Sequence, residues 1–558
     1  MASDAAMNEG ATASAAPAMK KPKLHGRAFY ESIGSPKYVV APMVDQSEFA
    51  WRMLSRSFLP ESQRSSILAY SPMFHARLFG ESQKYRDQHF QPTRPESNAP
   101  FLDGNPAIDR PFFVQFCAND PQALLNAAKL VAPYCDAVDL NLGCPQGIAK
   151  KGHYGAFLQE DQDLIHRMIK TLHENLDIPV TAKIRILDTK EATLMYAQNV
   201  LSAGASILTV HGRRREQKGH LTGLADWQMI RYLRDNLPPE TVLFANGNIL
   251  QHEDFEKCLA ATGADGVMSA EGNLSNPGIF AAPPPAGQEP RGYWRGRDGK
   301  GGWRVDEVFR RYLDIIHQYV LGAPSPPRRP LFVPGDDTAW MSEEILLPGQ
   351  GGHQSKPKKR RSDVAKENPA LMAANFIGMQ PHLFHLLRHF VSRHHDVRDA
   401  LAKARLGDME TYEAIYRLVE KKVAEGLLEY ERTDGKSVEE DAAAVAVEEN
   451  EDDPESSARA VRECKRPWWV VQPIIRPLPK EAMAKGAIQM SKKERKRMAA
   501  EMDEKEESVN GAKRSKDDSK AASNGDNAAA GEPGAGTVPA AQWLEKTTSY
   551  PSNELVSG

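Results

Sequence analysis

The chain has 558 residues, a formal net charge of −3, and 41% hydrophobic against 26% charged residues. This near-neutral balance excludes a uniformly basic coat for nucleic acid, although not a local basic patch. Five cysteines are too few for a disulfide scaffold and favour a reducing compartment. No stretch approaches the roughly 20 apolar residues that cross a bilayer, and the N-terminus does not resemble a secretory signal. We therefore expect no membrane partner and a location in the cytoplasm, the nucleus or both.

Composition changes sharply along the chain and divides it into predicted units. Polar stretches without periodicity indicate disorder or linkers, and dense apolar stretches with regular spacing indicate folded units. In chain order we predict a disordered leader at 1–30, a barrel at 35–320 with an insertion at 281–304 that cannot bury much, a linker or insertion at 323–369, a helical unit at 370–430, an acidic linker at 431–463, an apolar packing segment at 464–480 and a disordered charged tail at 481–558.

Eight short apolar runs in the dense region are predicted to be β-strands. They are nearly continuous in hydrophobicity, as parallel strands buried on both faces are, and amphipathic segments separate most of them. The runs are Tyr38–Ala41, Ile67–Tyr70, Phe112–Phe116, Ala137–Leu140, Val180–Ile184, Ile207–Val210, Val242–Ala245 and Gly266–Ser269. The predicted helices between them include Pro121–Val131, Asp161–Leu176, Thr193–Ala203, Trp227–Asn236 and Glu253–Ala261.

This rhythm predicts an α/β fold, a (β/α)8 TIM barrel followed by a smaller helical domain. An open doubly wound sheet is the competing architecture, and it is weakened because no GxGxxG motif follows the first strand. A barrel places its functional residues where the strands end. Polar or reactive groups do lie at these ends, in chain order Pro42-Met43-Val44, Met73 and His75, Gln115, Asn141 and Cys144, Lys183, His211 and Arg213, Asn246-Gly247-Asn248, and Ala270-Glu271.

Cys144 lies between Gly143 and Pro145 in a predicted tight turn, which suits a reactive thiol at the end of a strand. Cysteine is also commonly a small buried hydrophobe, and we favour that interpretation for Cys117 and Cys135, which lie in or beside apolar runs. No CxxC motif occurs in the chain. Disulfide exchange and a Cys-rich zinc site are therefore not expected.

Lys183 is a charged residue within an otherwise apolar strand, and a buried lysine is costly unless it meets an anion or a polarised ligand. The alternative is a structural ion pair inside the barrel. His211 precedes a basic cluster of Arg213, Arg214, Arg215 and Lys218. Such a cluster favours a site for a cofactor phosphate or an RNA backbone over an ordinary core histidine.

The loops after the seventh and eighth strands, residues 246–248 and 269–272, are candidates for phosphate binding because barrels frequently hold phosphate there. Asn-Gly pairs are also common turn formers.

The histidines of the segment HLFHLLRHF, His382, His385 and His389, raise the possibility of a metal site. No cysteine or neighbouring acidic residue completes a ligand set, and we expect no metal. A basic helical face containing Arg388 and Arg393 fits RNA contact, with a merely solvated face as the alternative. The runs KPKKRR (356–361) and KKERKR (492–497) fit nuclear localisation or polyanion binding, or serve only solvation.

Several segments, taken together and in order, resemble the tRNA-dihydrouridine synthases. They are YVVAPMVDQSEFAWRML, VQFCANDPQ, DLNLGCPQGIAKKGHYGAFLQ, VTAKIRI, TVHGRRREQKG, FANGNI and MSAEGNLSNP. The cysteine loop and SPMFHARLF are most similar to the eukaryotic branch that modifies positions 16 and 17 of the tRNA D-loop. The resemblance covers about Tyr38 to Phe280, and the helical unit is similar in placement to the family's tRNA-binding domain.

The resemblance implies FMN in the barrel mouth, NADPH or NADH as reductant, and the tRNA D-loop as substrate. It assigns FMN binding to Pro42, Met43, Val44, Gln115, Lys183, His211, Asn246, Gly247, Asn248, Ala270 and Glu271. Cys144 would protonate uracil C5 while hydride reaches C6 from the flavin, and an ordinary thiol is largely protonated at neutral pH. We place Asn141, His153, Arg213, Arg215, Arg388 and Arg393 in contact with RNA.

Arg214 is a departure from the family pattern, since a threonine usually stands at this position. We expect the nicotinamide dinucleotide to bind in turn with tRNA at the same open face of the barrel. Two other functions remain open. One is a flavin-dependent reductase of a free pyrimidine, as dihydroorotate dehydrogenases are. The other is an RNA-binding protein without catalytic activity. Flavin bound to the purified protein would favour either of the two enzymes, the tRNA-dihydrouridine synthase or the free-pyrimidine reductase, over the inactive RNA-binding protein.

Overall fold

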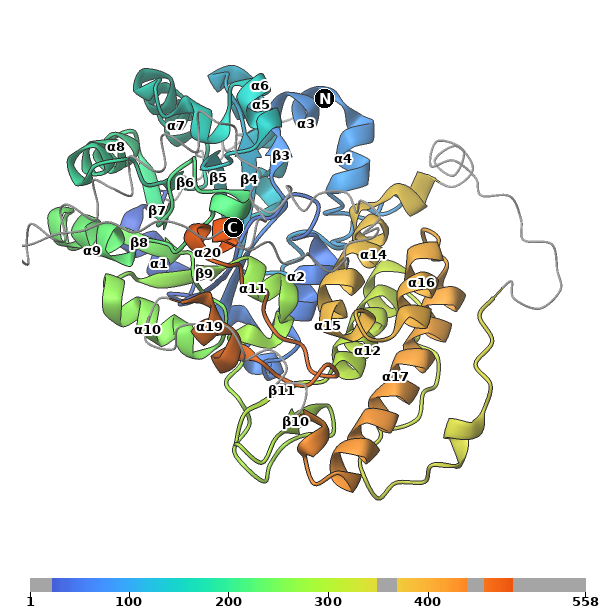
Figure 1. Cartoon of the computed structure of the whole chain (residues 1–558). Helices are drawn as coiled ribbons and strands as arrows, with labels where there is room; N and C mark the ends of the chain where they lie inside the picture. Colours follow the sequence, from blue (N-terminus) through green and yellow to red (C-terminus); the bar gives the residue numbers. More distant parts are fainter. Residues whose placement is uncertain (1–22, 349–368, 439–455, 485–558) are drawn as a thin grey trace, which may run out of the picture.

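The computed structural model describes residues 23–348, 369–438 and 456–484. Its centre is a barrel of eight parallel strands, and all eight predicted strands are confirmed within one or two residues (Figure 1). The strands are β1 (Tyr38–Val40), β2 (Ile67–Tyr70), β4 (Phe112–Cys117), β5 (Ala137–Leu142), β6 (Val180–Arg185), β7 (Ala205–His211), β8 (Val242–Asn246) and β9 (Gly266–Ser269). Every residue of the six strands from β4 to β9 is buried, which explains why their sequences are continuously apolar rather than alternating.

The sheet closes on itself, so the open doubly wound alternative is excluded. β1 pairs with β2 on one side, where Val39 aligns with Leu68, and with β9 on the other. The remaining strands pair in chain order, and β2 meets β4 through Ala69 and Phe112 to complete the ring. The short strand β3 (Phe74–His75) extends the edge of β4. Closure brings the carboxyl ends of all eight strands to one mouth.

Helices surround the barrel, and several begin at an acidic or hydroxyl N-cap. Asp120, Asp161, Thr189 and Asp226 each accept a hydrogen bond from a backbone N–H of the first turn, which satisfies a donor that the helix itself leaves unpaired. The helices of the barrel are α2 (Phe49–Arg56), α3 (Ala76–Glu81), α4 (Gln83–His89), α5 (Pro121–Val131), α6 (Gly147–Gly152), α7 (Gln162–Asn175), α8 (Lys190–Ser202), α9 (Trp227–Asn236), α10 (Glu253–Thr262) and α11 (Glu271–Ser275).

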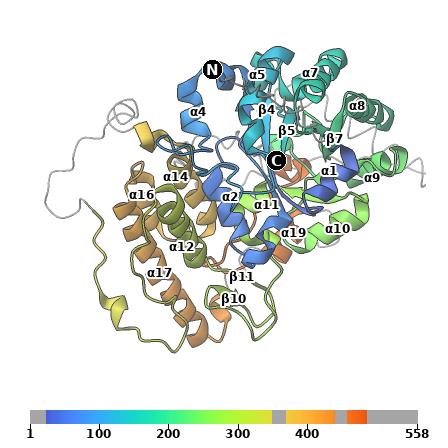
Figure 2. The ribbon, with the colours of Figure 1, turned by 180° about the vertical axis from the view of Figure 1, so that it is seen from behind.

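The predicted disordered leader at 1–30 is wrong for its last residues, because α1 (Gly26–Ser32) forms there. Phe29 stacks on Phe113 at the start of β4, and the Tyr30 hydroxyl donates to the carbonyl of Asp265 at 3.0 Å. Both aromatic side chains are about 4% exposed. The burial of these two aromatic side chains anchors α1 against the barrel. The helix lies on the side of the barrel opposite to α20 (Pro479–Ala484) (Figures 1 and 2).

A helical unit lies beside the barrel (Figure 1). It contains α14 (Ala374–Leu386), α15 (Arg388–Val391), α16 (His395–Lys403) and α17 (Met409–Arg432). The helix α12 (Val305–Ile315) packs against both α2 of the barrel and α17, and so joins the two. Among the described residues, no helix is both long and apolar enough to cross a membrane.

Residues 456–484, here called the return segment, come back from the helical unit to the barrel. It contains α19 (Ser457–Cys464) and α20. The predicted insertion at 281–304 forms a hairpin of β10 (Tyr293–Arg295) and β11 (Gly301–Trp303), and it buries more than we predicted because the return segment covers it. The N–H of Val471 donates to the carbonyl of Trp303, and Trp469 to Val471 are at most 3% exposed.

Four stretches that bear on our predictions lie outside the described residues, namely 1–22, 349–368, 439–455 and 485–558. They hold most of the predicted leader, part of the linker at 323–369, part of the acidic linker, most of the predicted tail and both basic runs.

Candidate active site

The mouth of the barrel gathers most of the side chains that we predicted there. Gln115 lies on β4, Asn141 on β5, Lys183 on β6, His211 at the end of β7 and Asn246 at the end of β8. Each of these polar side chains is at most 5% exposed, although such residues are ordinarily found at the surface. Neighbouring strands align them directly, with Asn141 opposite Lys183 and His211 opposite Asn246.

Cys144 follows β5 in a loop that two basic side chains hold in place. Arg185 donates to the carbonyl of Gly143 at 2.6 Å, and Lys218 donates to that of Pro145 at 2.8 Å. Gly155 has a φ of +63° and passes so close that a Cβ there would lie 2.9 Å from the Cys144 Cβ. The thiol is 1% exposed and packs in a small apolar cluster with Cys117 and Tyr154. The loop therefore presents the sulfur in a fixed, water-poor position.

Two cations lie behind this loop inside the barrel. Burial lowers the pKa of Lys183 to about 7 and that of Arg185 to about 9, and a thiolate at Cys144 would raise the pKa of both. The carboxylate of Asp139 also attracts Lys183, without offsetting the cost of burial. A site with uncompensated buried cations favours an anionic or strongly polarised ligand.

His211 is held as a specific neutral tautomer by Arg213. The Arg213 guanidinium can only donate, and its Nη1 lies 3.1 Å from the His211 Nε2, so Nε2 must accept and the ring proton must reside on Nδ1. Burial lowers the pKa of His211 well below its ordinary value, and the nearby cations Arg185, Lys183 and Arg213 lower it further. The imidazole is consequently neutral at physiological pH.

The unpaired groups of the mouth fit a flavin. Within the described residues, the buried His211 Nδ1 and the buried Asn246 Oδ1 have no hydrogen-bond partner. A buried donor, a buried acceptor and the Lys183 ammonium match the alternating carbonyl and N–H groups of an isoalloxazine edge. Gly247, with a φ of +114°, would place a Cβ 2.6 Å from that of Ala225, so only glycine allows this backbone path.

Arg213 closes the adjacent loop around this position. Its guanidinium donates to the Asn248 Oδ1 at 2.7 Å and to the carbonyl of Gly223 at 3.0 Å. Arg213 is 8% exposed and its donors face protein groups, so a contact between Arg213 and RNA stays a prediction. The loop that contains Gly247 and Asn248 is therefore rigid and lies beside a permanent positive charge, as phosphate binding requires.

Glu271, directly after β9, is paired with Arg476 of the return segment at 2.5 Å. Arg476 also lies close enough to Arg213 and Arg388 to lower the pKa of both, an effect smaller than that of burial. The barrel, the helical unit and the return segment thus each bring one arginine to the same corner of the mouth.

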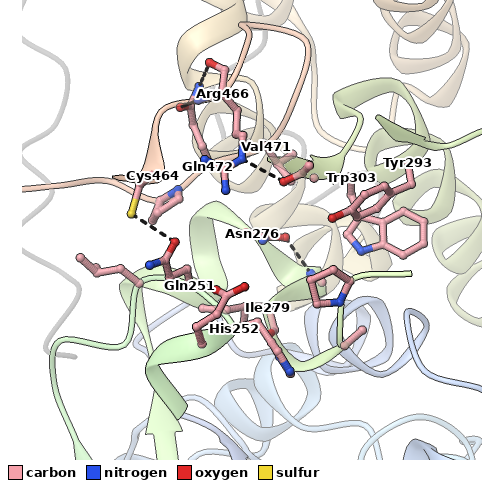
Figure 3. Close-up of a pocket in the computed structure, with 18 residues that line it drawn as sticks. Gln251, His252, Asn276, Ile279, Tyr293, Trp303, Cys464, Arg466, Val471 and Gln472 are labelled. Carbon is pink, nitrogen blue, oxygen red and sulfur yellow. Dashed lines mark hydrogen bonds between the residues drawn. The ribbon is translucent and has the colours of Figure 1, made fainter. Parts of the chain in front are cut away.

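The return segment leaves a small cavity of about 70 Å³ where it crosses the loop after β8 (Figure 3). Gln251, Trp303, Cys464, Arg466 and Gln472 line it, and none of the predicted site residues does. The Arg466 N–H donates to the Gln472 Oε1 at 2.9 Å, and the Cys464 thiol faces Gln251. The cavity is far smaller than the several hundred Å³ that a flavin needs, so it belongs to the packing of the segment.

The other predicted RNA contacts are spread over two surfaces. His153 is exposed in a left-handed conformation on the Cys144 loop, while Arg215 is half-buried and pairs with Glu160 at 2.6 Å. Arg388 and Arg393 are exposed on the helical unit, where Arg393 lies over the Trp468 ring.

His382, which we considered only as a possible metal ligand, is a core residue. It is fully buried, its Nε2 lies 2.9 Å from the Glu48 carboxylate of the barrel, and its ring stacks on Trp51 at 4.2 Å. An acidic neighbour therefore exists, although it comes from 334 residues away. Within the described part of the chain, no group of three histidine, cysteine or acidic side chains is arranged to hold a metal ion.

Sequence reasoning missed three groups that hold the site together, namely Arg185, Lys218 in its contact with the Cys144 loop, and Arg476. Arg185 had a usable signal, because it lies two residues after Lys183 and so shares its face of the strand. Arg476 had none, since nothing local indicates its partner.

The fold agrees with the comparison to known proteins. Residues 39–292 match the family model described as dihydrouridine synthase. The chain is 43% identical over 462 residues to a Schizosaccharomyces pombe protein, covering 82% of this chain and 93% of the relative. It therefore belongs to the dihydrouridine synthase family.

Three relatives show which branch of the family the chain is most similar to. The S. pombe protein and a Saccharomyces cerevisiae protein are both named tRNA-dihydrouridine(16/17) synthase [NAD(P)(+)]. The latter is 56% identical over 56% of this chain and 67% of its own length. A human protein named tRNA-dihydrouridine(20a/20b) synthase [NAD(P)+]-like is 35% identical over 44% of this chain and 70% of its own length. The likeness is thus stronger to the 16/17 relatives than to the 20a/20b relative.

Proposed function

We propose that this protein reduces the C5–C6 double bond of uridines 16 and 17 in the D-loop of tRNA, with NADPH or NADH as reductant and FMN as cofactor. The observation that carries this proposal is Cys144, held beside buried cations at the mouth of the barrel in a chain of this family. The names of the 16/17 relatives support the positions and the nicotinamide.

FMN, when bound, supplies hydride chemistry to the site. We assign its ring to Gln115, Lys183, His211 and Asn246 and its phosphate end to the loops at 247–248 and 270–271, with Pro42, Met43 and Val44 along the first loop. His211 would donate through Nδ1, because Arg213 occupies Nε2. Lys183 would stabilise negative charge that develops on a carbonyl oxygen.

Cys144 would act as the general acid. Its Sγ–H donates a proton to C5 of the uracil, which leaves a thiolate in the apolar cluster around Tyr154. A buried thiolate is costly unless a cation is near, and Lys183 and Arg185 both lie within electrostatic reach of Cys144. Arg185 therefore both anchors the loop and, together with Lys183, lowers the free energy of the charge that proton donation creates.

The substrate uridine must leave the folded tRNA to reach a thiol that is only 1% exposed. We assign the reading of tRNA shape to the helical unit through Arg388 and Arg393, and contacts nearer the base to Asn141 and His153. A location in the cytoplasm or the nucleus agrees with five cysteines, none of which forms a disulfide.

The experiment is dihydrouridine formation in unmodified whole tRNA with NADPH, mapped to position. We expect product at positions 16 and 17. Cys144→Ala should retain flavin and lose activity by at least about 100-fold, the usual contribution of a positioned acid. Cys117→Ala is the matched control, because Cys117 belongs to the same buried cluster and has no assigned role. Product on free uridine, or equal activity of both variants, would contradict the assignment.

A further inference from the structure

A chain of hydrogen bonds runs across the inside of the barrel from Asp139 to the Cys144 loop. The Gln115 Nε2 donates to the Asp139 Oδ2 at 2.7 Å, and the Asn141 Nδ2 donates to the Gln115 Oε1 at 2.8 Å. The Asn141 Oδ1 then accepts from the N–H of Gly143 at 3.1 Å and from that of Cys144 at 2.9 Å. Asp139 and Gln115 are fully buried, so no water competes with these bonds.

The direction of this chain is set at its first member. An ionised carboxylate only accepts, so Gln115 must turn its NH2 group toward Asp139 and its carbonyl toward Asn141. Asn141 must then turn its own NH2 group toward Gln115. Its carbonyl is left facing the loop, where two backbone N–H groups need an acceptor.

An asparagine at position 139 would occupy the same space without this constraint. It could donate as well as accept, and both amides of the chain could then reverse. In the reversed state the NH2 group of Asn141 would face the N–H groups of Gly143 and Cys144, and these donors would lose their acceptor. A buried charge inside an apolar strand is costly, but a carboxylate permits only one direction of the chain, whereas a neutral amide would permit both.

We propose that Asp139 is a positioning residue for the proton donor. It fixes the conformation of the Cys144 loop through Gln115 and Asn141. Asp139 does not touch the substrate in this scheme. It determines which way two amides face, and hence whether the backbone at Cys144 is held. The inference deepens the proposed function, since it assigns a determinant of the proton-donating geometry.

The test compares Asp139→Asn with Thr181→Val in the purified flavoprotein. The Thr181 hydroxyl donates to the other carboxylate oxygen of Asp139 at 2.6 Å, so Thr181→Val also removes a hydrogen bond from this carboxylate but leaves position 139 acceptor-only. We expect Asp139→Asn to lower kcat about tenfold, the effect of losing a buried acceptor, with the KM for tRNA within about twofold. Thr181→Val should keep kcat within about twofold of the wild-type value.

A second readout does not depend on turnover. Alkylation of Cys144 by iodoacetamide, followed by mass spectrometry, reports opening of the loop, and the buried Cys258 in the same molecule reports opening of the core. Asp139→Asn should raise the rate for Cys144 about tenfold while Cys258 stays unchanged. Equal acceleration of both cysteines would indicate general destabilisation and overturn the inference.

A double variant tests direction itself. In Asp139→Asn with Gln115→Glu, the acceptor-only group moves one position along the chain, and Asn141 must again present its NH2 group to it. We expect Cys144 alkylation to return toward the wild-type rate. Acceleration that persists in the double variant, or that Thr181→Val reproduces, would show that direction is not the cause. If the wild-type protein forms no dihydrouridine, the proposed function fails, and the alkylation rates still decide the role of Asp139.

Discussion

Glu271 accepts hydrogen bonds from the Arg476 Nε at 3.0 Å and from its Nη2 at 2.5 Å, across 205 residues of chain. The last loop of the barrel mouth is thus neutralised by the return segment rather than by the barrel. Arg476→Ala leaves a carboxylate beside the predicted phosphate position, and we expect flavin affinity to fall about tenfold through repulsion. Fluorescence titration of the flavin measures this.

Arg459→Ala is the control for that experiment. Arg459 lies in the same segment, is half-exposed and, within the part of the chain that the structure describes, pairs with Glu463. It should leave flavin affinity unchanged, because exposed pairs contribute little. Adding Glu271→Gln to Arg476→Ala should restore part of the affinity. No recovery would show that Arg476 acts by packing and not by charge.

Lys183→Met should stabilise the flavin-free protein and abolish flavin retention. Burial lowers the pKa of Lys183 to about 7 from an ordinary 10.5, so its charged form costs stability. The cost is complete below pH 7 and declines as the pH rises from 7 to 10.5. We therefore expect a Tm gain of roughly 2–4 °C at pH 6 and a smaller gain at pH 9, by thermal unfolding.

Lys190→Met, at an exposed position of α8, provides the comparison for Lys183→Met. A loss of stability on Lys183→Met would mean that the lysine forms a net favourable ion pair with Asp139, the structural alternative for this residue.

The pH–rate profile should have an acid limb that belongs to Asp139. Burial raises the pKa of Asp139 to about 6, although Thr181, Gln115 and Lys183 act to lower it, and Tyr70 also faces the carboxylate. Below this pH the protonated carboxyl can donate, so the hydrogen-bond chain loses its fixed direction. We expect kcat to fall as the pH drops through 6 and this limb to be absent in Asp139→Asn.

The effect of Asp139 on stability runs opposite to its effect on activity, because stability rises as the pH falls. An acid whose folded pKa is raised costs stability when ionised, and this cost disappears as the pH falls from 6 toward 3.8. Circular dichroism should therefore show folded protein across the acid limb. Coincident loss of structure and activity would attribute the limb to unfolding.

His382→Ala should destabilise the protein by about 3–5 kcal/mol, because it leaves the buried Glu48 carboxylate without its partner. Denaturant unfolding measures the loss. Adding Glu48→Gln should recover part of it by removing the unpaired charge. His395→Ala, an exposed position of the same unit, should change stability by less than about 0.5 kcal/mol.

Arg388→Glu and Arg393→Glu should weaken tRNA binding without altering flavin content. Each lost phosphate contact should lower the slope of log affinity against log salt by about 1. Arg432→Glu, at the far end of α17 and 75% exposed in its side chain, is the control. An unchanged salt slope in the first two variants would place the tRNA on another surface.

The strands of the barrel could be predicted from sequence because burial on both faces imposes a continuous apolar run, as in Phe112–Cys117. Once the strands were predicted, their carboxyl ends were known, and Cys144, Lys183 and His211 could be identified as candidate site residues there. Lys183 was visible for the same reason, since a charge inside such a run contradicts its surroundings.

The partners of these residues could not be predicted. Glu48 and His382 lie 334 residues apart, and nothing in the sequence around either residue indicates the other. Arg476 lies in a Pro-rich apolar segment whose docking position depends on the finished barrel. The α1 helix was missed because two aromatic residues, Phe29 and Tyr30, sufficed to anchor a segment of otherwise polar composition.

The order of synthesis has a consequence for how this protein matures. All eight barrel strands have left the ribosome once residue 269 has emerged, so the barrel can fold while the rest is still being translated. Arg476 follows Glu271 by 205 residues, and the helical unit is made in between. Under the proposed function, the nascent chain has its proton donor long before Arg476 reaches Glu271, and we expect tight flavin loading only after residue 476 has emerged.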